Sequence, residues 1–217
     1  PYTTSSDLSY VPGGNNPEDG HREYSQLMSS SLALISDHIL ETYPLTDYQS
    51  LIDVAGGTGN FARMVKKRYP DITATVLDLP EVVSEAKNQF PRSDIRFVAT
   101  DMFHSPLPQD VELFSLVRVL HDHDDEPVVS LLTRLHAALK PGGHLLIAEP
   151  MAGTPGAEAI GDTYFGFYLW AMGSGRPRTA NELKGMCLAA GFSGIREFNT
   201  PIPALTRVLV AEKAPAQ

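Results

Sequence analysis

Acidic residues and one histidine recur along the chain directly after runs of apolar residues. Each run is rich in Val, Ile and Leu, the composition of a strand buried on both faces of a sheet. Parallel strands share their carboxyl ends, and open α/β sheets bind ligands at that edge. We therefore expect five side chains at one edge, namely Asp53, Asp78, Asp101, His121 and Glu149.

The first of these residues precedes a glycine-rich turn. An apolar strand that contains Asp53 runs into Gly57-x-Gly59-x-x-Ala62, and apolar residues at helical spacing follow. Glycines let the backbone turn sharply and let a ligand approach closely. The spacing also matches the dinucleotide-binding fingerprint, with Asp78 about 20 residues further on. The turn therefore predicts a cofactor site, although a purely structural turn is an alternative.

Two cofactor classes use such a turn, and charge distinguishes them. A carboxylate at Asp53 repels a pyrophosphate but attracts a cation. S-adenosylmethionine carries an ammonium and a sulfonium and has no phosphate. The sequence therefore favours S-adenosylmethionine over a nicotinamide dinucleotide.

Two further acids suit an adenosine group. Asp78 can accept hydrogen bonds from both ribose hydroxyls, with Leu79 packed on the adenine, while Asp101 and Met102 suit the exocyclic amino group and an adenine face. The alternatives are a helix-start acid beside Pro80 and a simple turn. These features would serve any adenosine ligand, so they do not separate the two cofactor classes.

His121 is the candidate general base. An imidazole has a suitable pKa near neutral pH, and a neutral alcohol is a poor nucleophile toward a sulfonium methyl group without a base. Glu149, one strand over, is expected to orient the imidazole and stabilise its cation. The alternative is a helix start with Asp122 or Asp124 as cap and Pro127 in the first turn, which explains the acids but not the histidine.

The same stretch could also be interpreted as a set of metal ligands. Its polar residues are His121, His123, Asp124, Asp125 and Glu126. Four ligands need a fixed geometry that spacing alone does not reveal. Solvated capping acids are the preferred interpretation, and we expect no metal.

The densest aromatic stretch follows the strand that ends near Glu149. It lies in an expected helix over residues 157–172 and offers Phe165, Tyr168 and Trp170 as lining for an apolar substrate pocket. Met28, in an earlier helix, is a further pocket candidate. Plain core packing explains these residues equally well.

Composition excludes several functional classes. The chain has 217 residues, 42% of them hydrophobic and 20% charged, which suits one α/β domain. Its net charge of -9 gives no electrostatic support to nucleic-acid binding. A single cysteine, Cys187, rules out an intrachain disulfide and fits a reducing, cytoplasmic compartment. No apolar run reaches the roughly 18 residues of a transmembrane helix.

Alternation of strands and helices predicts the fold. We expect a loop or disorder over residues 1–20, a helix within residues 21–44, and a catalytic domain over residues 45–217. A capping box, Thr179-x-x-Glu182, starts a late helix. The final strand pair is antiparallel, because its connection is too short for a crossover helix. The expected strands cover residues 51–55, 72–77, 95–99, 113–120, 144–148, 195–199 and 205–211. The prediction is a seven-stranded, mostly parallel sheet with an antiparallel last strand and helices on both faces.

Four motifs together resemble a known family. The stretches 53–59, 77–80, 101–103 and 120–126 look like those of the caffeic-acid type O-methyltransferases, and the resemblance covers about residues 21–212. Residues 118–126, 147–158 and 164–179 look most like the bacterial carotenoid branch. The resemblance implies a Rossmann-like class I methyltransferase fold and methylation of a tertiary hydroxyl at the end of a long polyene. A polyketide or phenolic hydroxyl is the alternative, and a catalytically silent cofactor-binding module is another.

The resemblance also assigns roles to residues. It implies His121 as the base and Glu149 as its orienting carboxylate. It implies peripheral membrane contact, to reach a carotenoid. The implied contacts to S-adenosylmethionine are Asp53, Gly57, Asp78, Leu79, Asp101, Met102, Phe103 and Arg118.

Three features depart from the family pattern. Ala55 stands where a glycine is commoner, and Pro177 stands where plant members have a second catalytic glutamate. Family members also have an N-terminal helical dimerisation domain, of which this chain has at most the last helix. The resemblance thus implies a catalytic-domain fragment of a homodimer.

Overall fold

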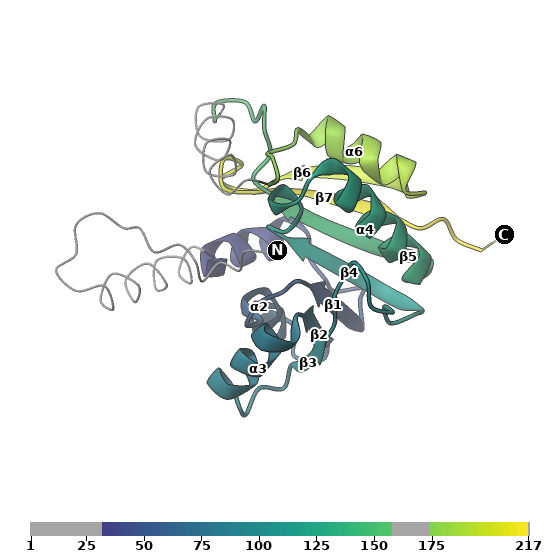
Figure 1. Ribbon diagram of the computed structural model, residues 1–217. Helices are drawn as coiled ribbons and strands as arrows, with labels where there is room; N and C mark the ends of the chain where they lie inside the picture. Colours follow the sequence, from purple (N-terminus) through teal and green to yellow (C-terminus); the bar gives the residue numbers. More distant parts are fainter. Residues whose placement is uncertain (1–31, 158–173, 217) are drawn as a thin grey trace.

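The computed structural model describes residues 32–157 and 174–216 (Figure 1). The predicted loop over residues 1–20 and most of the aromatic stretch lie outside the described residues. Within them, no helix is both long and apolar enough to cross a membrane.

One seven-stranded sheet forms the centre of the molecule, in the order β3-β2-β1-β4-β5-β7-β6 (Figure 1). The strands are β1 (Ser50–Val54), β2 (Thr73–Asp78), β3 (Arg96–Ala99), β4 (Val111–Val117), β5 (Leu139–Glu149), β6 (Ser193–Asn199) and β7 (Arg207–Glu212). Strands β1 to β5 pair in parallel, whereas β7 runs antiparallel to both β5 and β6. The strand order reverses between β1 and β4, the point where open α/β sheets bind ligands. The predicted fold class is confirmed.

Helices cover both faces of this sheet. Alternate residues of β5 point to opposite sides: Leu145 and Ile147 pack with α4 and α6, while Leu146 and Ala148 pack with α2 and the helix of residues 32–42. Strands covered on both faces must be mostly apolar, as the sequence pattern indicated. The labelled helices are α2 (Asn60–Arg68), α3 (Pro80–Gln89), α4 (Asp125–Ala138) and α6 (Ala180–Ala189).

Two predicted helix starts are confirmed. Pro80 lies in the first turn of α3, where its missing N–H costs nothing. At α6 the hydroxyl of Thr179 accepts from the amide of Glu182 at 3.2 Å, and the Glu182 carboxylate accepts from the amide of Thr179 at 2.8 Å. This capping box fixes the direction in which the chain approaches the helix.

Strand β4 is shorter than predicted. It ends at Val117 rather than Leu120, because Arg118 adopts a left-handed φ of 58° and turns the chain out of the sheet. The next two amides, of Val119 and Leu120, donate to the Glu149 carboxylate instead of to a strand. His121 therefore lies in a 3₁₀ helix, η2 (Leu120–Asp122), and not directly at a strand end.

Strand β5 is longer than predicted. It begins at Leu139 rather than His144, and the Lys140–Gly143 turn residues stay hydrogen-bonded to the sheet. The amide of Gly142 donates to the carbonyl of Lys213, and the amide of Lys213 donates to the carbonyl of Gly143, both at 2.9 Å. Apolar periodicity missed this extension because it contains Pro and Gly.

Candidate active site

The glycine-rich loop after β1 makes a tight left-handed path. Ala55, Gly57 and Gly59 have φ values of 53°, 59° and 83°. Gly56 has a different reason to lack a side chain: a Cβ there would lie 2.4 Å from the Asp53 carboxylate. The loop therefore folds directly over Asp53, and its outer side is open at Gly57, where an added Cβ would meet no atom within 4 Å.

Asp53 lies beneath this loop rather than on its surface. It is 1% exposed, and its Oδ1 accepts from the Ser115 hydroxyl at 2.6 Å. Burial, with a smaller contribution from the charge of Asp78, raises the pKa of Asp53 to about 7 against the lowering effect of the Ser115 hydrogen bond. An adjacent cation would lower that pKa again. The cofactor role of Asp53 stays a prediction.

Asp78 connects the ends of β1 and β2. Its Oδ2 accepts from the amide of Gly57 at 2.7 Å, and its Oδ1 accepts from the amide of Leu79 at 2.8 Å. Burial raises its pKa, although both amide hydrogen bonds oppose the shift. Leu79 is 40% exposed, unusual for a leucine. An apolar side chain beside a fixed carboxylate fits an adenosine group.

Hydrogen bonds within the loop after β3 fix its conformation. Asp101 accepts from the amide of Phe103 and from the His104 ring, both at 2.8 Å. Burial alone would raise the pKa of Asp101, but these hydrogen bonds outweigh it and lower the pKa. Arg134 of α4 donates to the carbonyl of Met102 at 3.1 Å. The loop is thus positioned, and its adenine contacts stay a prediction.

His121 and Glu149 form the buried centre of the edge. The imidazole Nδ1 lies 2.5 Å from Glu149 Oε2, and the two residues are 7% and 2% exposed. The other carboxylate oxygen accepts from the amides of Val119 at 2.8 Å and Leu120 at 2.7 Å. One carboxylate therefore orients the ring and its turn together, and it favours a proton on Nδ1.

Asp122 contacts the opposite ring nitrogen. Its Oδ1 lies 3.2 Å from His121 Nε2. Asp122 was expected only as a possible helix cap, whereas Asp124 is the N-cap and its carboxylate accepts from the Gly175 amide at 3.1 Å. The 3₁₀ turn brings adjacent side chains together, which strand-end reasoning could not foresee.

The charges around His121 set its protonation. Burial alone lowers the pKa of the imidazole, but the neighbouring carboxylates of Glu149 and Asp122 outweigh burial and the opposing charge of Arg118. The pKa of His121 therefore lies above its ordinary value. Arg118, predicted as a cofactor contact, is thus placed near His121, and its cofactor contact stays a prediction.

A buried arginine, Arg178, holds the turn that carries His121. It is 2% exposed and donates to the carbonyls of Leu120 and His123, each at 2.7 Å. It also donates to Asp125. This role was not predicted, because an arginine before a capping box carries no catalytic pattern.

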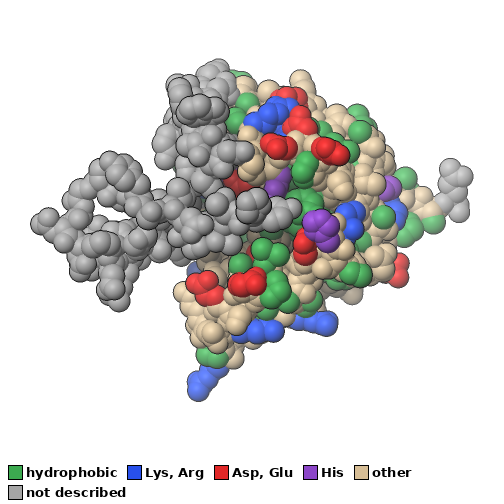
Figure 2. All heavy atoms as spheres, viewed as in Figure 1, with side chains coloured by type: hydrophobic (Ala, Val, Ile, Leu, Met, Phe, Trp, Pro, Cys, Tyr) green, Lys and Arg blue, Asp and Glu red, His purple; other side chains and the backbone are tan. Residues whose placement is uncertain are grey.

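A contact between two rings joins the loop after β3 to the turn after β4. Phe103, from the loop after β3, meets the His123 ring edge-on at a centroid distance of 5.0 Å. Figure 2 shows histidine and acidic side chains gathered on the face where β4 and β5 end. The loop after β3 and the turn that carries His121 are therefore contiguous.

The predicted metal alternative finds no support in the geometry. His121, Asp124 and Asp125 point to separate partners, namely Glu149, the Gly175 amide and two arginines. Across residues 32–157 and 174–216, no group of three or more His, Cys, Asp or Glu could hold a metal ion.

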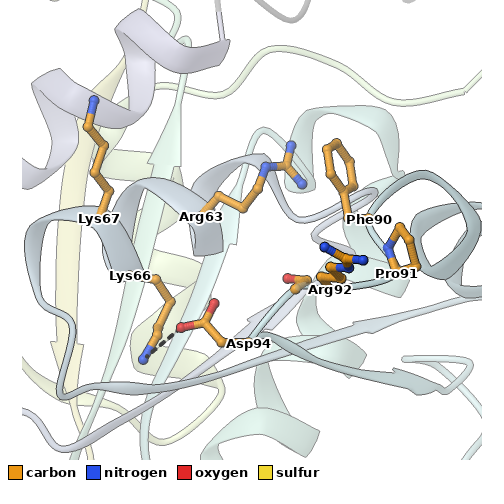
Figure 3. Close-up of a pocket in the computed structure, with 8 residues that line it drawn as sticks. Arg63, Lys66, Lys67, Phe90, Pro91, Arg92 and Asp94 are labelled. Atoms are coloured by element: carbon orange, nitrogen blue, oxygen red, sulfur yellow. Dashed lines mark ion pairs between the residues drawn. The ribbon is translucent and has the colours of Figure 1, made fainter.

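A cavity of about 580 Å³ lies elsewhere, beside α2 and the loop after α3 (Figure 3). Arg63 stacks over the Phe90 ring at 3.9 Å and donates to the Thr58 carbonyl at 2.5 Å. Lys66 pairs with Asp94 at 3.3 Å. None of the predicted site residues lines this cavity.

The predicted pocket residues Met28, Phe165, Tyr168 and Trp170 lie outside the described residues. Their contacts with a substrate stay a prediction.

Comparison with known proteins decides the family. A family model described as the O-methyltransferase domain matches residues 9–193. The chain belongs to this family. It is 42% identical to demethylspheroidene O-methyltransferase of Rhodobacter capsulatus, an alignment that covers 94% of the chain and 52% of that protein. It is 33% identical to mouse acetylserotonin O-methyltransferase, covering 78% of the chain and 46% of that protein.

A solved methyltransferase structure also resembles this chain. Human N-acetylserotonin methyltransferase, in complex with S-adenosylmethionine, superposes with a TM-score of 0.78 at 27% identity. The match covers 88% of this chain and 55% of that one. The O-methyltransferase domain described here thus spans about half the length of these relatives.

Proposed function

We propose that this chain is the catalytic part of an S-adenosylmethionine-dependent O-methyltransferase that methylates a tertiary hydroxyl of a hydroxycarotenoid, such as demethylspheroidene or hydroxyneurosporene. The observation that carries the proposal is the buried contact of 2.5 Å between His121 Nδ1 and Glu149 Oε2 at the edge of a class I methyltransferase sheet. A silent cofactor-binding module would have no use for such a pair, because taking two ionisable groups out of water is costly even when they contact each other.

The residues at the carboxyl edge fit the cofactor. Asp78 is fixed for the ribose hydroxyls, Leu79 is exposed for the adenine, and Gly57 leaves room at the open side of its loop. The buried carboxylate of Asp53 favours a cationic ligand over a pyrophosphate. S-adenosylmethionine supplies an electrophilic methyl group on its sulfonium.

His121 supplies the proton acceptor. Its Nδ1 proton is directed to Glu149, so Nε2 is the nitrogen that takes the proton of the substrate hydroxyl. Asp122 beside Nε2 stabilises the imidazolium that results. An aliphatic alcohol is far less acidic than a phenol, so alignment of the hydroxyl oxygen with the methyl carbon supplies much of the remaining acceleration.

The substrate class rests on the relatives. The Rhodobacter capsulatus protein at 42% identity is a demethylspheroidene O-methyltransferase. A long polyene also suits the aromatic residues Phe165, Tyr168 and Trp170 as pocket lining. We further propose that the full-length protein is a cytoplasmic homodimer that contacts a membrane peripherally to obtain this substrate.

Methyl transfer can be assayed directly. The full-length protein is incubated with methyl-labelled S-adenosylmethionine and, in parallel, a tertiary carotenol, a phenol and a polyketide alcohol. Mass spectrometry should find the label on the carotenol oxygen. Transfer only to the phenol or the polyketide would move the assignment to that class, and binding without transfer to any of them would indicate a silent module.

A further inference from the structure

The main chain that carries His121 is held from both sides. On one side the Leu120 amide donates to Glu149, the same carboxylate that accepts from the imidazole. On the other side the Leu120 carbonyl, which belongs to the peptide bond leading into His121, accepts from Arg178 Nη1 at 2.7 Å. The His123 carbonyl accepts from Arg178 Nη2 at the same distance. One guanidinium therefore spans the turn on which the base sits.

Asp125 anchors this guanidinium. Its Oδ1 accepts from Arg178 Nε at 3.0 Å and from Nη2 at 2.7 Å. The carboxylate is half exposed, whereas the Arg178 side chain is buried. A planar fork with fixed donors can satisfy two carbonyls and a carboxylate together, which a single ammonium cannot. Arginine is therefore specifically suited to this position.

Close packing adds a third restraint. Gly175 has a φ of 82°, and a Cβ there would lie 2.2 Å from the His121 carbonyl oxygen. Its backbone thus presses directly on the residue that carries the imidazole. The Ser174 hydroxyl donates to the adjacent Asp122 carbonyl at 3.2 Å. The segment before α6 is consequently docked on the catalytic turn.

We propose that Arg178, anchored by Asp125, is a positioning residue that holds the His121 turn in register for methyl transfer. This inference rests on the proposed role of His121 as base. A displacement of about 1 Å of a reacting group can lower a rate by roughly a hundredfold. Arg178 touches neither the imidazole nor the hydroxyl in this account, so its whole effect passes through the turn.

The test replaces Arg178 with lysine in the full-length protein. Arg178→Lys keeps the charge but cannot bridge both carbonyls, so kcat should fall by about tenfold to a hundredfold. Affinity for S-adenosylhomocysteine should stay within about twofold, because binding at the cofactor loops does not require this turn. Arg68→Lys is the matched control. Arg68 pairs with Asp37 and bonds neither Asp125 nor a carbonyl of the turn, so its variant should keep wild-type kcat.

A second readout does not depend on activity. Histidine ring nitrogens are labelled, and the titration of His121 is followed by NMR. The charged groups facing it are Glu149, Asp122, Arg118 and His123. A loosened turn weakens the contact between Glu149 and the His121 ring. The midpoint of the His121 titration should therefore fall by about half a pH unit or more in Arg178→Lys. A merely structural arginine would lower the melting temperature without moving this midpoint.

Asp125→Asn keeps the proposal testable if Arg178→Lys does not fold. The half-exposed carboxylate can be neutralised with little packing change, and the same two effects should follow, with a kcat loss on the order of threefold. Wild-type kcat and an unchanged midpoint in the folded variants would overturn the positioning role. Absence of transfer in the wild type would instead overturn the proposed function, while the NMR titration would still test the turn.

Discussion

At the residue scale, His121 lies between two carboxylates. Glu149 contacts Nδ1 and Asp122 contacts Nε2, and together they raise the pKa of the imidazole against the effect of burial. A base must be neutral to accept a proton. The raised pKa therefore favours the inactive, protonated form at low pH, and the working form is gained as pH rises through it.

The raised pKa of His121 predicts how the reaction rate depends on pH. The wild-type kcat/KM should rise with pH through a midpoint above the ordinary histidine value of about 6.5. Glu149→Gln removes the charge that raises the pKa of His121 most, while burial still lowers that pKa. The midpoint of the kcat/KM profile should therefore move to lower pH, and the maximal rate should fall. Glu182→Gln, in the capping box of α6, is the control and should leave the midpoint unchanged. A midpoint that stays in place in Glu149→Gln would contradict the assignment.

Ala55 is a second informative residue. Its φ of 53° is unfavourable for a residue with a Cβ, by roughly 1–2 kcal/mol. A glycine is commoner at this position in the family that the sequence resembles, and the positive φ gives the physical reason. The structure shows the strain directly.

Ala55→Gly should therefore leave the protein as stable or increase its free energy of unfolding by up to about 1 kcal/mol. The gain is limited because the partly buried methyl group loses some packing. Ala62→Gly, in α2, makes the same chemical change at a buried helical position and should destabilise by about 1 kcal/mol or more. Chemical denaturation measures both. A loss of stability in Ala55→Gly as large as that in Ala62→Gly would contradict the strain.

At the element scale, the sequence predicted strands and helices well where burial imposes a pattern. The apolar strands, the Pro80 start of α3 and the Thr179 capping box follow from local rules. The turn at His121 does not follow from local rules, because it depends on Glu149, which is 28 residues away. Arg178 was missed for the same reason: its partners Leu120 and His123 are distant in sequence.

Asp78 lies at the junction of two elements. Its carboxylate accepts from the amides of Gly57 and Leu79, and we expect it also to accept from the ribose hydroxyls. Asp78→Ala should therefore weaken S-adenosylhomocysteine binding by roughly 1.5–3 kcal/mol, the scale of hydrogen bonds to a charged group. Calorimetry measures this, with Asp94→Ala, beside the distant cavity, as control. NAD should not bind to the wild type, and affinity within twofold of wild type in Asp78→Ala would contradict the ribose role.

At the scale of the whole molecule, the chain spans about half the length of its relatives. The resemblance places dimerisation in an N-terminal helical domain. We therefore predict that the full-length protein is a homodimer and that residues 1–217 alone are monomeric or weakly associated. Light scattering on both proteins measures this, and an equally tight dimer of residues 1–217 would contradict it.

The carboxyl edge of the sheet brings the candidate site residues together. Parallel strands bring the glycine loop, Asp78, the Asp101 loop and the His121–Glu149 pair to one side, as the order of the strands requires. What the sequence could not supply was the direction of each side chain. The placement of Asp53 beneath its loop is the clearest case, because its position before the glycines did not reveal that the loop would bury it.

The central claim is that His121 is the base for methyl transfer, and one variant tests it most directly. His121→Ala should lower kcat by about 10²–10⁴-fold, the usual contribution of a general base, while affinity for S-adenosylhomocysteine stays nearly unchanged. His136→Ala, in α4 against Phe192, serves as the histidine control and should keep its turnover. Turnover of His121→Ala within a few-fold of wild type would show that the hydroxyl is activated by alignment alone and that the histidine is structural.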